Sequence, residues 1–107
     1  MIESGSVVLL HLVNPTEKFW GVLLELNTTG ATFRGLNVAS FEDWVSQAAS
    51  TEAATLGLAT AFVPLLRVER IFLDEQVGEV ESYTQRFERR VGVPLNVYLD
   101  IEHLSPE

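Results

Sequence analysis

Short runs of apolar residues separated by polar breaks fill the first third of the chain, and they predict three β-strands. Residues 7–13 are aliphatic except for His11, a pattern typical of a strand buried on both faces. Residues 18–26 and 31–38 carry apolar side chains at alternate positions. The polar break between them ends in Gly30, which predicts a hairpin loop with a positive φ at that glycine.

The middle of the chain predicts one short helix and two further strands. Ser40 is a favourable N-cap before an amphipathic segment, so we expect a helix over about residues 40–49. Residues 61–73 are rich in β-branched and aromatic side chains, but they are too long for one strand. We therefore divide them near Val68 into two short strands, the first of which lies at an edge or a bulge because it contains Pro64.

The C-terminal part of the chain predicts a helix and then a strand. Ser82 and Gln85 have the spacing of a capping box, and Gly92 is a favourable C-cap. Alternating apolar and polar residues over 95–102 predict a half-buried strand. Before this part, the small and polar residues 49–60 predict a loose connection.

These elements predict one domain of 107 residues that is mainly β with two short helices, an α+β fold. We expect residues 7–73 to form a small, strongly bent, five-stranded barrel with the helix as an insertion, because Gly35 inside a strand favours a bend or a close backbone approach. Residues 79–104 add a C-terminal helix and strand. A chain of this length buries about two-thirds of its unfolded surface, which is enough for a core.

Two short motifs lie within the predicted barrel. Their residues are Gly21, Leu23, Leu26 and Asn27 in the first, and Leu66, Arg67 and Ile71 in the second. They resemble the motifs of the Sm and Sm-like family, which implies an SH3-like barrel, side-by-side assembly into rings, and RNA binding. Ala31 stands where the family has its base-contacting asparagine, and Val68 stands where it has a glycine. The resemblance therefore implies a degenerate base pocket, because an amide is needed to read a base edge.

Charge narrows the choice of partners. The chain has 15 acidic and 7 basic residues, so its net charge of −8 repels phosphate backbones and anionic membranes. Nucleic acid would require a local basic patch, for which the candidates are Arg34, Arg67, Arg86, Arg89 and Arg90. The last three also have a simpler role, since cations in the last turn of a helix stabilise its exposed carbonyl groups.

Arg34 and Arg67 lie on predicted strands, where a guanidinium group pairs well with a carboxylate such as that of Glu25 or Glu69. Such a pair forms either within the chain, on the outside of the sheet, or between two subunits. The sequence leaves both arrangements open.

Catalytic chemistry has little support in the sequence. The absence of cysteine excludes disulfides and thiolate sites, and His11 in its apolar run favours a packed core or interface residue. The acidic residues 74–81 lack calcium-loop spacing, so they predict a solvated turn, and we expect no metal, cofactor or small-molecule substrate. The first apolar run is too short for a signal peptide or a membrane span, so we expect a cytoplasmic protein.

Three functions remain open. The first is a non-catalytic interaction or scaffold module that self-associates through strand edges and through Phe19, Trp20, Phe41 and Trp44. The second is an Sm-like RNA-binding protein that uses the arginines named above. The third is a small enzyme that combines His11 with a nearby carboxylate.

Overall fold

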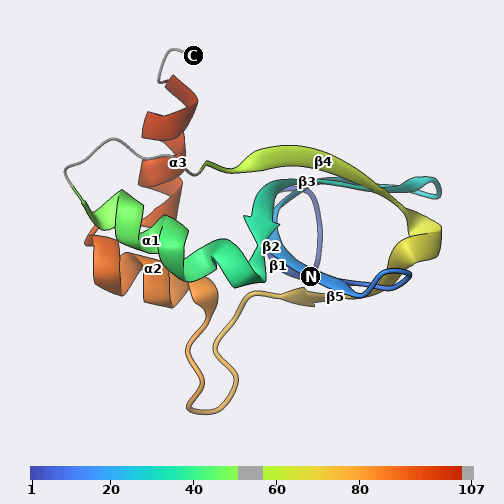
Figure 1. Ribbon diagram of the computed structural model, residues 1–107, viewed down its shortest axis with the longest axis horizontal. Coiled ribbons are helices and arrows are strands. Elements are labelled where there is room, and N and C mark those ends of the chain that lie inside the picture. Colours follow the sequence, from blue (N-terminus) through green and yellow to red (C-terminus); the bar gives the residue numbers. More distant parts are fainter. Residues whose placement is uncertain (51–56, 105–107) are drawn as a thin grey trace.

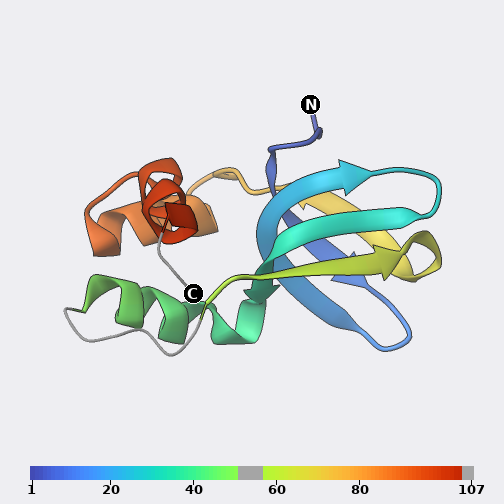
Figure 2. The same cartoon turned by 90° about the horizontal axis from the view of Figure 1, so that it is seen from above.

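Five antiparallel strands curl into one sheet beside a group of short helices in the computed structural model, which describes residues 1–50 and 57–104 (Figures 1 and 2). The strands are β1 (Val7–Leu12), β2 (Glu17–Leu26), β3 (Gly30–Asn37), β4 (Ala59–Pro64) and β5 (Val68–Leu73). The helices are α1 (Phe41–Ala49), α2 (Tyr83–Val91) and α3 (Leu95–Leu104), with 3-10 turns η1 (Val38–Ser40) and η2 (Leu65–Arg67). The α+β class and the five strands predicted within residues 7–73 are confirmed. Of the predicted connection at residues 49–60, positions 51–56 lie outside the described residues.

The sheet is open, with the strand order β4-β3-β2-β1-β5. Its curvature brings β4 and β5 to opposite sides of a trough, as Figure 1 shows. In the described part of the chain β4 pairs with β3 and β5 pairs with β1, and no pairing joins β4 to β5. The predicted closure into a barrel is therefore wrong, because five strands with this curvature leave two free edges.

A close approach of two glycines bends the centre of the sheet. Gly21 of β2 lies directly opposite Gly35 of β3. A Cβ atom on Gly35 would lie 2.1 Å from the Trp20 carbonyl oxygen, and one on Gly21 would lie 2.3 Å from the Arg34 carbonyl oxygen. No side chain fits at either position without moving backbone, so the predicted close approach at Gly35 is confirmed.

Asn27, and not the glycine, organises the hairpin between β2 and β3. Its side-chain oxygen accepts hydrogen bonds from the backbone N–H groups of Thr29 at 2.9 Å and Gly30 at 3.3 Å. Gly30 has no positive φ, so that prediction is wrong. It is the first residue of β3, where a Cβ would lie 2.2 Å from the Val63 carbonyl oxygen. Glycine at this position allows β3 and β4 to pack closely.

Two hydrophobic clusters lie on the two faces of the sheet. The inner cluster, inside the trough, consists of Val8, Leu10, Leu12, Leu23, Ala31, Phe33 and Val63. The outer cluster, between the sheet and the helices, consists of Trp20, Phe41, Trp44, Val45, Leu58, Phe87 and Leu95. Alternate residues of β1 contribute to each cluster, so the prediction of a strand buried on both faces is confirmed.

The first two helices follow the predicted bounds closely. In α2 the Ser82 hydroxyl accepts from the Gln85 N–H at 3.0 Å and the Gln85 side chain accepts from the Ser82 N–H at 2.7 Å, which completes the predicted capping box. Gly92 ends the helix with φ +88°. Before α1, Ser40 makes no side-chain cap. The Asn37 side chain accepts instead from the Ala39 N–H at 2.8 Å, one turn earlier.

The predicted C-terminal strand is wrong, because residues 95–104 form helix α3. Leu95, Tyr98 and Leu99 recur at helical spacing and pack against the outer cluster. The Leu95 N–H donates to the Glu88 carboxylate at 2.9 Å, which satisfies a donor at the start of the helix. An apolar surface already formed by α1 and α2 therefore selects the helical periodicity over the alternating one.

Candidate functional site

The aromatic residues expected at an interface lie inside the molecule. Trp20, Phe41 and Trp44 are fully buried, and Phe19 is partly buried with its ring 5.3 Å from that of Phe33. Trp20 packs edge-on against Phe41 at 5.2 Å between ring centres, because α1 and α2 cover the outer face of β2. Trp20, Phe41 and Trp44 belong to the core, so the interface prediction is wrong for these three residues, whereas Phe19 is only partly buried.

A single carboxylate fastens the helices to the sheet. Asp74 follows β5, and its Oδ2 atom accepts a hydrogen bond from the Trp20 indole N–H at 2.9 Å. The same carboxylate accepts from the N–H groups of Tyr83 at 2.8 Å and Thr84 at 2.7 Å, and from the Thr84 hydroxyl at 2.6 Å. For Asp74 the prediction of a solvated acidic turn is wrong. No group of three metal-ligating side chains occurs in the described residues.

The arginines of α2 bind the carboxylates of neighbouring elements. Arg86 and Arg90, one turn apart, each lie 2.8 Å from a carboxylate oxygen of Glu42 in α1. Arg89 lies 2.6 Å from Glu81, and its hydrogen bond lowers the pKa of that carboxyl below its ordinary value. The ion pairs of Arg86 and Arg90 join α2 to α1, and that of Arg89 joins α2 to the segment that precedes it.

Arg67 holds the turn between β1 and β2. It donates to the carbonyl oxygens of Val13 at 3.0 Å and Pro15 at 2.8 Å, and to the Glu17 carboxylate at 2.7 Å. The ion pair is therefore within the chain, with Glu17 in place of the predicted partners. Arg34 lies half-buried on β3, opposite Val22 of β2.

A row of basic side chains crosses the outer face next to the helices. Arg70 of β5 pairs in register with His11 of β1, which pairs with Lys18 of β2. Burial lowers the pKa of His11, and the positive charges of Lys18 and Arg70 lower it further. The ring of Phe72, on the same face, lies 4.9 Å from the His11 ring and 5.9 Å from the Arg70 guanidinium carbon. We call Arg70, His11 and Lys18 the basic row. The sequence did not indicate that these three residues are neighbours, because the strand register brings them together.

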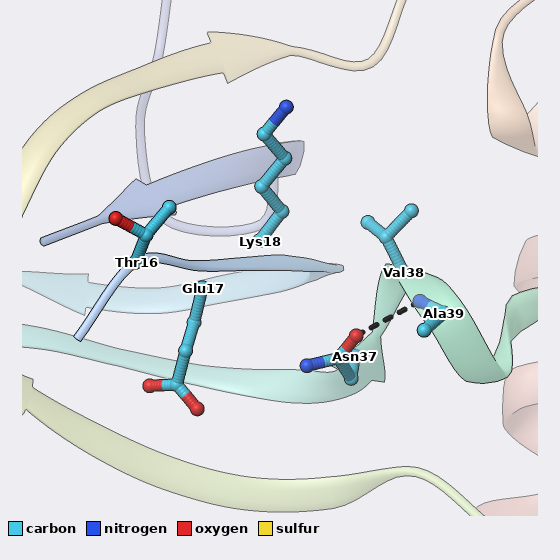
Figure 3. A pocket seen from close by; sticks show the side chains of 6 residues that line it. All are labelled: Thr16, Glu17, Lys18, Asn37, Val38 and Ala39. Carbon is cyan, nitrogen blue, oxygen red and sulfur yellow. Dashed lines mark hydrogen bonds between the residues drawn. The ribbon is translucent and has the colours of Figure 1, made fainter.

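A shallow hollow of about 380 Å³ lies at the Lys18 end of the basic row. Figure 3 shows the start of β2 on one side of it and η1 on the other, with the Lys18 and Glu17 side chains pointing apart. His11 does not line this hollow. The lining offers the Thr16 hydroxyl, the Glu17 carboxylate, the Lys18 amine and the Asn37 side chain.

The two free edges of the sheet differ in chemistry. β5 carries Glu69 and Arg70, and Glu69 is left without a partner at a shift in its register with β1. Charges and a bulge of this kind protect an edge from pairing with another strand. β4 contains no charged residue and is exposed along most of its length. Its only proline is its last residue, Pro64. The unprotected edge is therefore β4.

Comparisons with protein-family models, curated proteins and solved structures gave no significant match. Within the described residues, no helix is long and apolar enough to cross a membrane.

Proposed function

We propose that this protein is a non-catalytic interaction module that self-associates through the free edge of β4. The uncharged and exposed edge of that strand is the observation on which the proposal depends. An edge strand presents unpaired N–H and C=O groups, and pairing with a second copy would satisfy them.

Exposed apolar side chains beside β4 support this choice. Phe62 of β4 is 53% exposed, and Leu66 of η2, directly after the strand, is 93% exposed. Burial of a leucine or phenylalanine side chain contributes about 1.5–3 kcal/mol. These residues would therefore add hydrophobic stabilisation to the main-chain hydrogen bonds of a paired edge.

The Sm-like mode of assembly, though not the closed barrel, remains part of the proposal. Side-by-side assembly of the kind that the family resemblance implies requires a sheet with two free edges, and β4 and β5 are the ends of this sheet. The charged β5 edge favours an isologous β4 contact over a β4-to-β5 ring, since like edges pair antiparallel around a two-fold axis.

Light scattering of the purified protein tests the proposal. We expect a discrete oligomer in the micromolar range, and we expect Phe62→Lys to reduce its mass because the lysine places a charge on the edge. Leu24→Lys is the matched control, since Leu24 is similarly exposed but lies on the central strand β2. A monomeric wild-type protein, or equal effects of the two substitutions, would refute the β4 contact.

RNA binding is the second function to test. The guanidinium groups of α2 and Arg67 contact carboxylates, so retention of oligo-uridine at low salt would require a different surface. Absence of retention would remove this alternative.

A further inference from the structure

We propose that the basic row binds the acidic loop between β5 and α2 of a second copy of this chain. The inference rests on the proposed self-association and adds a second contact to the one at β4. It starts from two surfaces whose charges are opposite and whose apolar parts match.

The basic row keeps its positive charge available. Arg70 has a side chain 59% exposed, and its nearest carboxylate is that of the adjacent Glu69 at 3.9 Å. Lys18 is exposed and forms no ion pair with any described residue. Other arginines, those of η2 and α2, face carboxylates at 2.6–2.8 Å. In a chain of net charge −8, this row is a local positive surface with little compensation.

Phe72 gives the basic row an apolar centre. It lies opposite Leu9 in the register of β5 and β1, and its ring is partly exposed. A small cavity of about 200 Å³ extends from Phe72 and Leu9 toward Val77 and Val80. The surface therefore combines cations with a partly solvated aromatic side chain, a combination found in recognition sites.

The loop has the complementary chemistry. Val77 and Val80 form a two-residue ladder, with each N–H donating to the other carbonyl at 3.0 Å, and their side chains are 69% and 70% exposed. Glu75 precedes Val77, and Glu79 lies between the two valines in the turn; both glutamates are exposed and have no ion pair with the described residues. Figure 1 shows this loop projecting away from both the sheet and the helices. The loop therefore presents two exposed valines, with one negative charge before them and one at the turn between them.

A second copy fits these observations better than a polyanion does. The net charge of −8 repels a second copy as well as nucleic acid, but nucleic acid brings a negative charge at every phosphate, whereas an acidic loop brings only a few charges to the row. Each copy carries both the basic row and the loop, and the loop begins where β5 ends. Two copies related by a two-fold axis could therefore exchange loops, so that one interface contains the contact twice.

Charge reversal tests the inference with two variants that complement each other. The first is Lys18→Glu with Arg70→Glu, and the second is Glu75→Lys with Glu79→Lys. Alone, each variant has row and loop of the same sign, so we expect its dissociation constant at this contact to rise at least tenfold. A mixture of the two has opposite signs at both contacts, and we expect it to recover the wild-type mass in sedimentation velocity at low salt. Glu3→Lys, an exposed charge change elsewhere, is the control and should leave the mass unchanged.

The outcomes separate this contact from the β4 contact. A reduced mass in each reversed variant and recovery of the wild-type mass in the mixture support the inference, even where Phe62→Lys has no effect. Wild-type mass in either reversed variant, or no recovery in the mixture, overturns it, while an effect of Phe62→Lys still supports the proposed function. A monomeric wild-type protein refutes both. Binding of oligo-uridine that is lost in the first variant would assign the row to nucleic acid and also overturn the inference.

Discussion

Replacement of Asp74 by alanine should separate the helices from the sheet more effectively than any other single change of a polar residue described above. The Asp74 carboxylate accepts hydrogen bonds from the Trp20 indole, from two N–H groups at the start of α2 and from the Thr84 hydroxyl. Asp74→Ala leaves the indole N–H of the buried Trp20 without its acceptor. It also removes a negative charge from the positive end of the α2 dipole.

The magnitude follows from the groups left unsatisfied. A buried donor without an acceptor costs about 1–3 kcal/mol, and the loss of a charge near a helix end costs about 0.3–1 kcal/mol. Water replaces part of the bonding at the exposed end of the helix, so we expect a loss of about 2–4 kcal/mol in the free energy of unfolding. For a domain of this size, that loss lowers Tm by roughly 8–20 °C.

Urea unfolding followed by tryptophan fluorescence measures this effect, because Trp20 reports on the bond that is removed. Asp74→Asn should lie between wild type and alanine, since it keeps one acceptor oxygen but places an amide among donors. Glu75→Gln is the control, because Glu75 is the neighbouring exposed carboxylate. A change below about 1 kcal/mol in Asp74→Ala, no larger than that of Glu75→Gln, would show that the carboxylate does not hold the two layers together.

Three further predictions concern the sheet. Gly35→Ala should lower the free energy of unfolding by about 3 kcal/mol or more, because the new methyl group meets the Trp20 carbonyl. The control Gly57→Ala should change it little, since a Cβ there meets nothing within 4 Å. Equal unfolding midpoints of the two variants in urea would contradict this prediction. Arg67→Ala should lower the free energy of unfolding by about 1–2 kcal/mol in calorimetry, and Arg67→Lys should restore part of this loss. An unchanged Tm would contradict the role of Arg67 in holding the β1–β2 turn. The pKa of His11 is lowered, so the unfolded chain binds the proton first and stability falls as the pH decreases through about 6.5; an NMR titration midpoint at or above that value would contradict the burial.

Local signals in the sequence predicted the fold well where a residue's own backbone decides the structure. The capping box at Ser82, the C-cap at Gly92 and the close approach at Gly35 each depend on a few neighbouring atoms, and all three are confirmed. The five strands of the sheet were also predicted with small errors at their ends, since alternating burial is a local pattern.

The errors occurred where distant parts of the chain decide. Apolar and polar residues alternate over 95–104 as in a strand, but Leu95 and Tyr98 pack against an apolar surface formed by other helices. This packing favours the helix over the strand. The same helices bury Trp20 and Trp44, which by sequence alone were equally suited to an interface. The sequence did not predict the basic row, because the register of β5, β1 and β2 brings its residues together. The spacing of residues along the chain does not determine the register between strands.

Hydrogen exchange at the backbone amides of β4 tests the central proposal most directly. If β4 pairs with a second copy, its outward-facing amides should become protected as the protein concentration rises, while those in the interior strand β2 stay unchanged. The Phe62→Lys variant should not show this concentration dependence. Equal exchange of the β4 amides in dilute and concentrated protein would contradict self-association through this edge.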